Sequence, residues 1–359
     1  MLDHAPARAD SRRADIECAG VRLVVVALAL VFATTAPARS APTPVTLREV
    51  RQSLFATCFV SDREGWMVGE LGRIFHTRDG GATWERQDAG TKRPFLAISC
   101  VDPHTAWIAG KEGIVYGTGD GGATWTQANT GSARHIFSLQ FPNRSRGHGC
   151  GDFGTMIHTE DGGQHWTVMQ VPPEVQLPES ALDTGVDPGD VNLYGVAYGD
   201  PDHVWVVGEF GTIMASDDGG RMFRQQHGPV ETTLFGVFFA DTRLGWAVGL
   251  DSVILHTEDG GQTWATQHVP VAQRLLYDVS VRGRVGWMVG SSGTILKSTD
   301  GGLTWALEPT PIELAANWIR SVGLSPDGAG LAVGAEGLVF RIEGPQIRRL
   351  EGAPRGRSS

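Results

Sequence analysis

One eight-residue box, present six times, constrains this chain more than any other feature. Its pattern is [Ser/Thr]-x-Asp-Gly-Gly-x-x-[Trp/Phe], and the first copy runs from Thr77 to Trp84. The spacings between successive copies are 41, 41, 57, 41 and 41 residues, with the central carboxylates at Asp79, Asp120, Asp161, Asp218, Asp259 and Asp300. Self-similarity at this period indicates a repeat architecture, in which each repeat is one supersecondary unit.

Each repeat contains four short apolar segments typical of strands. In the first repeat they begin near Leu54, Gly65, Arg73 and Thr83, and they are bounded by Gly, Asp and Pro. Four antiparallel strands in about 41 residues is the size of a β-propeller blade. The sequence therefore predicts an all-β protein made of four-stranded antiparallel blades.

A seventh repeat begins at Trp318 but carries no box and no clear fourth strand. The sequence thus predicts a seven-bladed β-propeller over residues 42–345, followed by a C-terminal tail over residues 346–359. We expect residues 46–50 to close the ring by pairing into blade 7, since this would hide two strand edges at once. Residues 346–350 are the competing candidate for that position.

The residue types of the box are explained by a tight turn between the third and fourth strands. The two glycines tolerate positive φ, and the Asp and Ser/Thr side chains accept hydrogen bonds from turn amides. The aromatic residue adds one apolar wedge per blade; it is Trp84, Trp125, Trp166, Trp264 and Trp305, with Phe223 in the fourth box. One carboxylate per turn is too few for calcium, and six copies argue against catalysis. We assign the boxes a structural role and expect no metal or other cofactor.

Residues 1–41 have the pattern of an export signal. Arginines precede an apolar run from Leu23 to Ala33, and small residues follow it. The run is short for a membrane span, although an uncleaved anchor stays an alternative. The protein is therefore expected in a periplasm or a lumen-like compartment. A net charge of −10 gives no support to nucleic-acid binding.

Three cysteines follow the signal, namely Cys58, Cys100 and Cys150, and a fourth, Cys18, lies within it. An odd number without CxxC spacing favours buried small hydrophobic residues over a disulfide framework. Cys58 and Cys100 fall on first strands of adjacent blades, so a bridge between them stays an alternative, but it is not predicted.

One face of the propeller gathers the candidate binding residues. In an up-and-down blade the strand 2–3 turns and the inter-blade connections share a face, and the boxes lie on the other. The longer spacing locates an acidic insertion of about 16 residues between Val168 and Val191, on the face opposite the boxes. Basic residues of that face are Arg93, Arg134 and Arg274 at equivalent positions, joined by Arg320 and Lys111. Such a cluster suits carboxylates; the alternative is ordinary surface arginines lying over apolar neighbours.

The repeats resemble a known family. The six boxes are similar to bacterial-neuraminidase-type repeats, and Gly-Trp-Met-Val-Gly-x-x-Gly-x-Ile followed by Thr-x-Asp-Gly-Gly-x-Thr-Trp, with a 41-residue period, resembles the photosystem II stability/assembly factor family over residues 45–342. This resemblance implies a non-enzymatic seven-bladed propeller, outside the stroma or cytoplasm, that helps newly made photosystem II subunits assemble with pigment. Members bear an arginine patch, to which Arg93, Arg134 and Arg274 correspond by repeat position.

Two other functions stay open at this point. Sialidases share the box, but they need an arginine triad and a Tyr nucleophile with a Glu partner, and the four tyrosines here all lie in strand patterns. Other Asp-box glycosidases use two carboxylates, which Glu70, Asp152, Glu209 or Asp251 could supply, although their recurrence favours solvated turn residues. A structural scaffold is the third possibility. We expect a monomeric, non-enzymatic protein that binds a membrane-protein complex or its newly made subunits.

Overall fold

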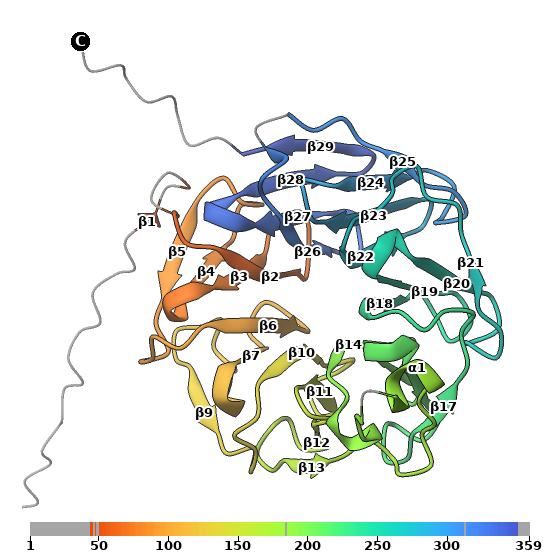
Figure 1. Cartoon of the computed structure of the whole chain (residues 1–359). Coiled ribbons are helices and arrows are strands. Elements are labelled where there is room, and N and C mark those ends of the chain that lie inside the picture. The colour runs from red at the N-terminus through yellow and green to blue at the C-terminus, as the bar shows by residue number, and fades with distance from the viewer. Residues whose placement is uncertain (1–43, 46, 48–49, 184, 312–313, 351–359) are drawn as a thin grey trace, which may run out of the picture. The chain divides into compact units, whose positions relative to one another are not determined.

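Seven antiparallel sheets form a ring in the computed structural model, which describes residues 44–45, 47, 50–183, 185–311 and 314–350 (Figure 1). Apart from one extra strand at the outer edge of the first sheet, strand order follows the chain, and the first strand of every blade lies at the centre. The predicted all-β, seven-bladed propeller of four-stranded blades is confirmed. The expected export signal lies outside the described residues.

The first four blades alternate short strands with tight turns. Blade 1 contains β2 (Leu54–Phe59), β3 (Gly65–Gly69), β4 (Ile74–Thr77) and β5 (Trp84–Gln87), with a two-residue strand β1 (Pro44–Val45) at its outer edge. Blade 2 contains β6 (Phe95–Cys100), β7 (Ala106–Gly110), β8 (Val115–Thr118) and β9 (Thr126–Ala128). Blade 3 contains β10 (Ile136–Gln140), β11 (Gly147–Gly151), β12 (Met156–Thr159) and β13 (Thr167–Met169). Blade 4 contains β14 (Leu193–Tyr198), β15 (Val204–Gly208), β16 (Ile213–Ser216) and β17 (Arg224–Gln226).

The last three blades repeat the pattern. Blade 5 contains β18 (Leu234–Phe239), β19 (Gly245–Gly249), β20 (Ile254–Thr257) and β21 (Ala265–Thr266). Blade 6 contains β22 (Leu276–Arg282), β23 (Val285–Gly290), β24 (Ile295–Ser298) and β25 (Ala306–Leu307). Blade 7 contains β26 (Ile319–Leu324), β27 (Ala329–Gly334), β28 (Val339–Glu343) and β29 (Gln346–Arg349). Strands 2 and 3 are joined by 3₁₀ turns in five blades, namely η2 (Glu70–Gly72), η3 (Lys111–Gly113), η5 (Glu209–Gly211), η6 (Leu250–Ser252) and η8 (Ala335–Gly337).

Ring closure differs from the sequence-based expectation. β29 pairs with β28 and completes blade 7 from within the blade itself, whereas β1 pairs with β5 of blade 1. The predicted N-terminal closure is therefore wrong, the competing candidate is right, and the propeller includes residues 346–349 that were assigned to the tail. The reason is local, because a hairpin across Gly344 and Pro345 closes a far shorter loop than recruitment of a segment from the other end of the chain.

Blades 1 and 7 are joined by side-chain packing instead of a shared strand. Val50, Leu54 and Met67 form one buried cluster with Leu331 and Val333. The Arg341 guanidinium adds a hydrogen bond from Nη2 to the Asp62 carbonyl at 2.9 Å. The seam is therefore closed by a hydrophobic core like those between the other blades.

Each box is internally hydrogen-bonded as its residue types predict. In the first box the Gly81 N–H donates to Thr77 Oγ1 at 2.8 Å, and the Thr83 N–H donates to Asp79 Oδ1 at 2.8 Å. Both glycines have positive φ, 74° at Gly80 and 91° at Gly81. The Asp carboxylate is thus occupied by its own turn.

The boxes also fasten neighbouring blades together, which the sequence analysis did not foresee. The Trp246 indole Nε1 of β19 donates to the carbonyl of Gly302, in the box of the next blade, at 3.0 Å. Trp107 and Trp205 likewise donate to a glycine carbonyl in the box of the next blade, at 3.1 Å each. In blade 3 the ring Nε2 of His148 contacts the Gly220 carbonyl at 3.1 Å. The box glycines therefore supply carbonyls as well as turn geometry.

A glutamine three residues after the box aromatic residue reinforces this contact in three blades. Gln267 donates from Nε2 to the Gly302 carbonyl at 3.0 Å and accepts at Oε1 from the indole of Trp305 at 3.0 Å. Gln87 and Gln226 bridge to the next blade in the same way. Where the equivalent residue is Ala128, Trp166 donates instead to a carbonyl of its own box.

Replacing Gln267 by Leu is expected to lower the free energy of unfolding by about 1–3 kcal/mol, because the buried Trp305 indole loses its acceptor. Urea denaturation of both proteins measures the difference. Gln262→Leu is the matched control, since this exposed position of the box is naturally Leu303 in the next repeat. Equal midpoints for the two variants would contradict the bridging role of Gln267.

The insertion packs against blades 3 and 4. It contains the short helix α1 (Glu179–Leu182) and the turn η4 (Pro188–Asp190), and it buries Val175 and Leu177. Gln176 exchanges two hydrogen bonds with the Gln225 side chain of β17. The Gly154 N–H, in the strand 2–3 turn of blade 3, donates to the Val191 carbonyl at 2.8 Å, so the insertion lies on the predicted face.

The cysteines correct a second expectation. Cys58 of β2 and Cys100 of β6 form a disulfide, with their Cα atoms 6.1 Å apart. The two residues come together because first strands of neighbouring blades lie side by side at the centre of the ring. Cys150 is free and buried, as predicted.

Candidate functional site: an aromatic collar at one mouth of the central channel

Backbone hydrogen bonds define the two faces of the propeller. The Glu70 N–H of the strand 2–3 turn donates to the Ser53 carbonyl just before β2, so these turns and the entries to the first strands share one face. The Gly80 N–H of the first box donates to the Arg63 carbonyl in the strand 1–2 turn, so the boxes lie at the other end. The predicted separation of boxes from the strand 2–3 turns is confirmed. We call the face without boxes the turn face.

Every first strand begins with an irregularity of register. In β2 the pairing with β3 shifts between Leu54 and Ala56, so that Phe55 is left out of the ladder, and the other six blades repeat this shift at the equivalent residue. A bulge of this kind re-aims a side chain. The seven residues, which we call the collar, are Phe55, Leu96, Phe137, Tyr194, Phe235, Tyr277 and Arg320.

The collar residues contact one another around the channel. Ring centroids are 5.4 Å apart for Phe137 and Tyr194, 5.3 Å for Tyr194 and Phe235, and 5.8 Å for Phe235 and Tyr277. The Arg320 guanidinium lies over the Tyr277 ring at 5.1 Å. All seven side chains are partly exposed, so an aromatic surface stays open to a ligand. The sequence did not reveal that these first-strand residues gather into one surface.

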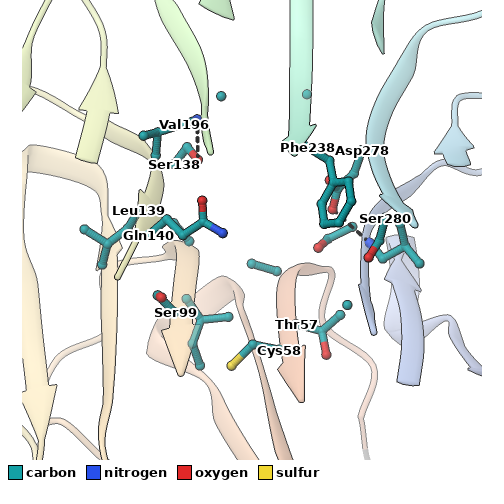
Figure 2. Close-up of a pocket in the computed structure, with 18 of the residues that line it drawn as sticks. Thr57, Cys58, Ser99, Ser138, Leu139, Gln140, Val196, Phe238, Asp278 and Ser280 are labelled. Atoms are coloured by element: carbon teal, nitrogen blue, oxygen red, sulfur yellow. Dashed lines mark hydrogen bonds between the residues drawn. The ribbon is translucent and has the colours of Figure 1, made fainter. Parts of the chain in front are cut away.

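Below the collar lies a central cavity of about 370 Å³, lined by first strands of all seven blades. Figure 2 shows Ser138 and Gln140 on one side of this cavity and Phe238 and Asp278 on the other. Ser138 Oγ accepts from the Val196 N–H at 3.2 Å, and Asp278 Oδ2 accepts from the Val322 N–H at 2.9 Å. Burial raises the pKa of the Asp278 carboxyl, which lies near Arg320.

The predicted basic residues occupy two different places. Arg320 lines the central cavity, where the pKa of its guanidinium is lowered by burial. Arg93 forms an ion pair from Nε to Glu112 Oε2 at 2.7 Å, and the Arg134 guanidinium lies over the Phe153 ring at 4.2 Å. Arg274 is held through its backbone by the strand 2–3 turn of blade 5, and Lys111 is exposed in η3. Arg93, Arg134 and Arg274 thus lie with the turns, outside the cavity that Arg320 enters.

One Tyr–Glu pair bears on the sialidase alternative. Tyr194 Oη donates to Glu209 Oε1 at 3.2 Å, and burial, followed by the charge of Glu209, raises the pKa of Tyr194 to about 12. Glu209 also accepts from the Asn192 backbone N–H at 3.0 Å, as Glu70 does from Ser53 at 3.2 Å. The repeated contact explains Glu209 as an anchor for the start of a first strand, and the raised pKa disfavours a tyrosinate nucleophile.

The described residues contain neither a cluster of metal ligands nor a membrane-spanning helix. No group of three or more His, Cys, Asp or Glu side chains within them is arranged to hold a metal ion. Nor does any helix in that part of the chain have the length and hydropathy to cross a membrane.

The fold and the boxes define the class, a seven-bladed Asp-box β-propeller with a collared central channel. Over residues 44–133 and 223–309 the sequence matches the model of the photosynthesis system II assembly factor YCF48 family, as its repeats predict. The chain is therefore similar to that family in two segments that make up just under half of its length. No curated protein matches the sequence significantly.

Solved structures agree on the fold. A structure of YCF48 bound to D1 peptide is 21% identical, with a TM-score of 0.64, over 85% of this chain and 97% of that one. YCF48 from Cyanidioschyzon merolae is 20% identical, with a TM-score of 0.65, over 84% and 99% of the two chains. The WD40 propeller domain of Doa1 is 12% identical, with a TM-score of 0.62, over 84% and 95%. At these identities the structural likeness establishes the propeller alone.

Proposed function

We propose that this protein is a non-enzymatic assembly factor, which binds a segment of a membrane-protein subunit on its turn face. The observation that carries the proposal is the collar, a partly exposed aromatic surface on a rigid ring that includes Arg320, with the Arg134 guanidinium at a neighbouring turn. Aromatic residues and arginine are the side chains that dominate protein-binding surfaces. The family match and the relative that binds D1 peptide support a polypeptide as the ligand.

The proposal includes export and a monomeric state. The Cys58–Cys100 disulfide supports an oxidising compartment, because such bonds persist outside the cytosol and are rare within it. The seven blades complete a ring within one chain, which supports a monomer because closure leaves no blade in need of a partner.

Replacing Arg93, Arg134 and Arg274 together by Ala is expected to abolish capture of the membrane partner while the propeller stays folded. Arg93 and Arg134 are exposed and Arg274 is partly exposed, so their loss removes charge from the turn face without opening the core. Crosslinked pull-down from host membranes, followed by mass spectrometry, compares the variant with the wild-type protein. Arg224→Ala, on the outer strand of blade 4, is the control.

Capture of the same complex by the triple variant would contradict the arginine contribution. Absence of any enriched membrane protein with the wild-type protein would contradict the assembly function itself. In that case, turnover of an aryl glycoside that is lost on changing Glu209 or Asp152 would support a hydrolase.

A further inference from the structure

We propose that the collar binds one aromatic side chain of the partner polypeptide and that Arg320 binds a carboxylate next to it. This inference deepens the proposed function and rests on it for the polypeptide nature of the ligand. It assigns to the channel mouth a specificity separate from that of the arginines at the turns.

The aromatic surface of the collar is continuous over four blades. Four rings, from Phe137 through Tyr194 and Phe235 to Tyr277, contact each other in sequence along consecutive blades. On the opposite arc Phe55 stacks on Trp318 at 5.8 Å, with the planes 8° apart. Rings held edge to edge or offset in this way present faces and edges to another ring, which is the arrangement that aromatic pairs prefer. The collar therefore favours an aromatic guest over an aliphatic one.

The volume of the central cavity limits what can enter it. The cavity of about 370 Å³ lies near the lower end of the roughly 300–1,000 Å³ range of ligand pockets. First strands from all seven blades surround it and cross-link through pairs such as Ser138 with Val196, so it cannot widen without separating blades. It therefore suits the insertion of a single side chain, while the rest of the peptide stays on the turn face.

The Arg320 guanidinium has few hydrogen-bond acceptors around it. Its guanidinium stacks on Tyr277 and makes one long hydrogen bond, from Nη1 to the Tyr277 carbonyl at 3.4 Å. A guanidinium has five N–H donors, and among the described residues no carboxylate lies within ion-pair distance of this one. The nearby Asp278 carboxylate already accepts two backbone N–H groups, from Val279 and Val322. Arg320 thus has donors to offer to an incoming carboxylate, which it can bind in bidentate fashion.

Four fluorescein-labelled eight-residue peptides test the proposal, each with one central pair in a Gly/Ser background. The pairs are Phe-Asp, Ala-Asp, Phe-Asn and Ala-Asn, and fluorescence anisotropy measures Kd against the full chain. We expect Phe-Asp to bind most tightly, with each single replacement raising Kd at least tenfold. Equal affinities for Phe-Asp and Ala-Asp would overturn the aromatic part, equal affinities for Phe-Asp and Phe-Asn would overturn the carboxylate part, and no binding at all would overturn both.

Variants of collar residues test the aromatic part and the carboxylate part of the proposal separately. Phe235→Ala should remove the preference for Phe over Ala, and Arg320→Gln should remove the preference for Asp over Asn. Met222→Ala, an exposed change in a box on the other face, is the matched control and should behave as the wild type. Thermal melts identify any variant that fails to fold, and Phe235→Leu then replaces Phe235→Ala.

The same variants separate this inference from the proposed function. If Phe235→Ala and Arg320→Gln capture the membrane partner as well as the wild type does, while the triple arginine variant does not, the collar proposal fails and the assembly function stands. If the wild-type protein captures no partner but discriminates between the peptides, the assembly function fails and the collar proposal stands.

Discussion

Replacing Cys58 and Cys100 together by Ser is expected to lower the free energy of unfolding by about 4 kcal/mol. The disulfide closes a loop across 42 residues, and a cross-link of that span removes this much loop-closure entropy from the unfolded chain. It ties blade 1 to blade 2 at the centre of the ring, so the unfolded chain loses freedom over a whole repeat. Denaturant unfolding with and without a dithiol reductant measures the effect.

The reductant provides the control within the same experiment. It should lower the stability of the wild-type protein by a similar amount and leave the double Ser variant unchanged, because Cys150 is free in both. Alkylation of the unfolded protein before reduction should modify Cys150 but neither Cys58 nor Cys100. Modification of all three would show that the bond does not form.

Acidification is expected to destabilise the protein from about pH 6.5 downward, with His148 as a main contributor. Burial, and then the charge of neighbouring His158, lower the pKa of His148 to about 3 from an ordinary value of 6.5. The unfolded state therefore binds a proton in this window and the folded state does not, so stability falls as pH falls. The loss is about 2 kcal/mol for this one group at pH 5. Unfolding midpoints at successive pH values measure it.

His148→Trp is the matched variant for this prediction. The equivalent residues Trp66, Trp107, Trp205, Trp246 and Trp287 show that the second-strand position accepts an indole. The variant should show a shallower loss of stability between pH 6.5 and 4, whatever its stability at pH 7. Burial, and then the charge of Arg78, also lower the pKa of His76 to about 3. His76 should therefore still contribute to the loss of stability in that window. An unchanged pH profile would contradict the role of His148.

The box carboxylates act in a lower pH window. The backbone and then the side-chain hydroxyl of Thr263 hold the pKa of Asp259 below its ordinary value of 3.8. Such a group stabilises the folded state above the unfolded pKa, and the contribution disappears as pH falls through the folded value. Loss of stability between pH 6.5 and about 5 is therefore attributable to histidines, and the box carboxylates add a further loss at lower pH.

The sequence alone determined the blade, the number of blades and the separation of the two faces. These follow from local chemistry, because a Gly-Gly turn, a period of 41 residues and alternating apolar segments specify a hairpin unit wherever it stands in the chain. The structural role of Asp79 and its five counterparts could be predicted for the same reason, since the partners of each carboxylate lie within four residues of it. Arg320 was identified as a candidate residue, although its neighbours were not.

The segment that closes the ring, the formation of the Cys58–Cys100 disulfide and the surroundings of the channel were settled by the three-dimensional structure. The disulfide and the channel surface depend on contacts between repeats, where residues about 40 apart in sequence are brought together by ring geometry. The collar shows this most clearly. Phe137, Tyr194 and Phe235 each look like one strand residue in the sequence, and a bulge common to all blades turns them out of their ladders toward a shared axis. The repeat period predicts the structure of one blade but not the collar at the centre of the ring, because the collar exists only when all seven first strands are in place.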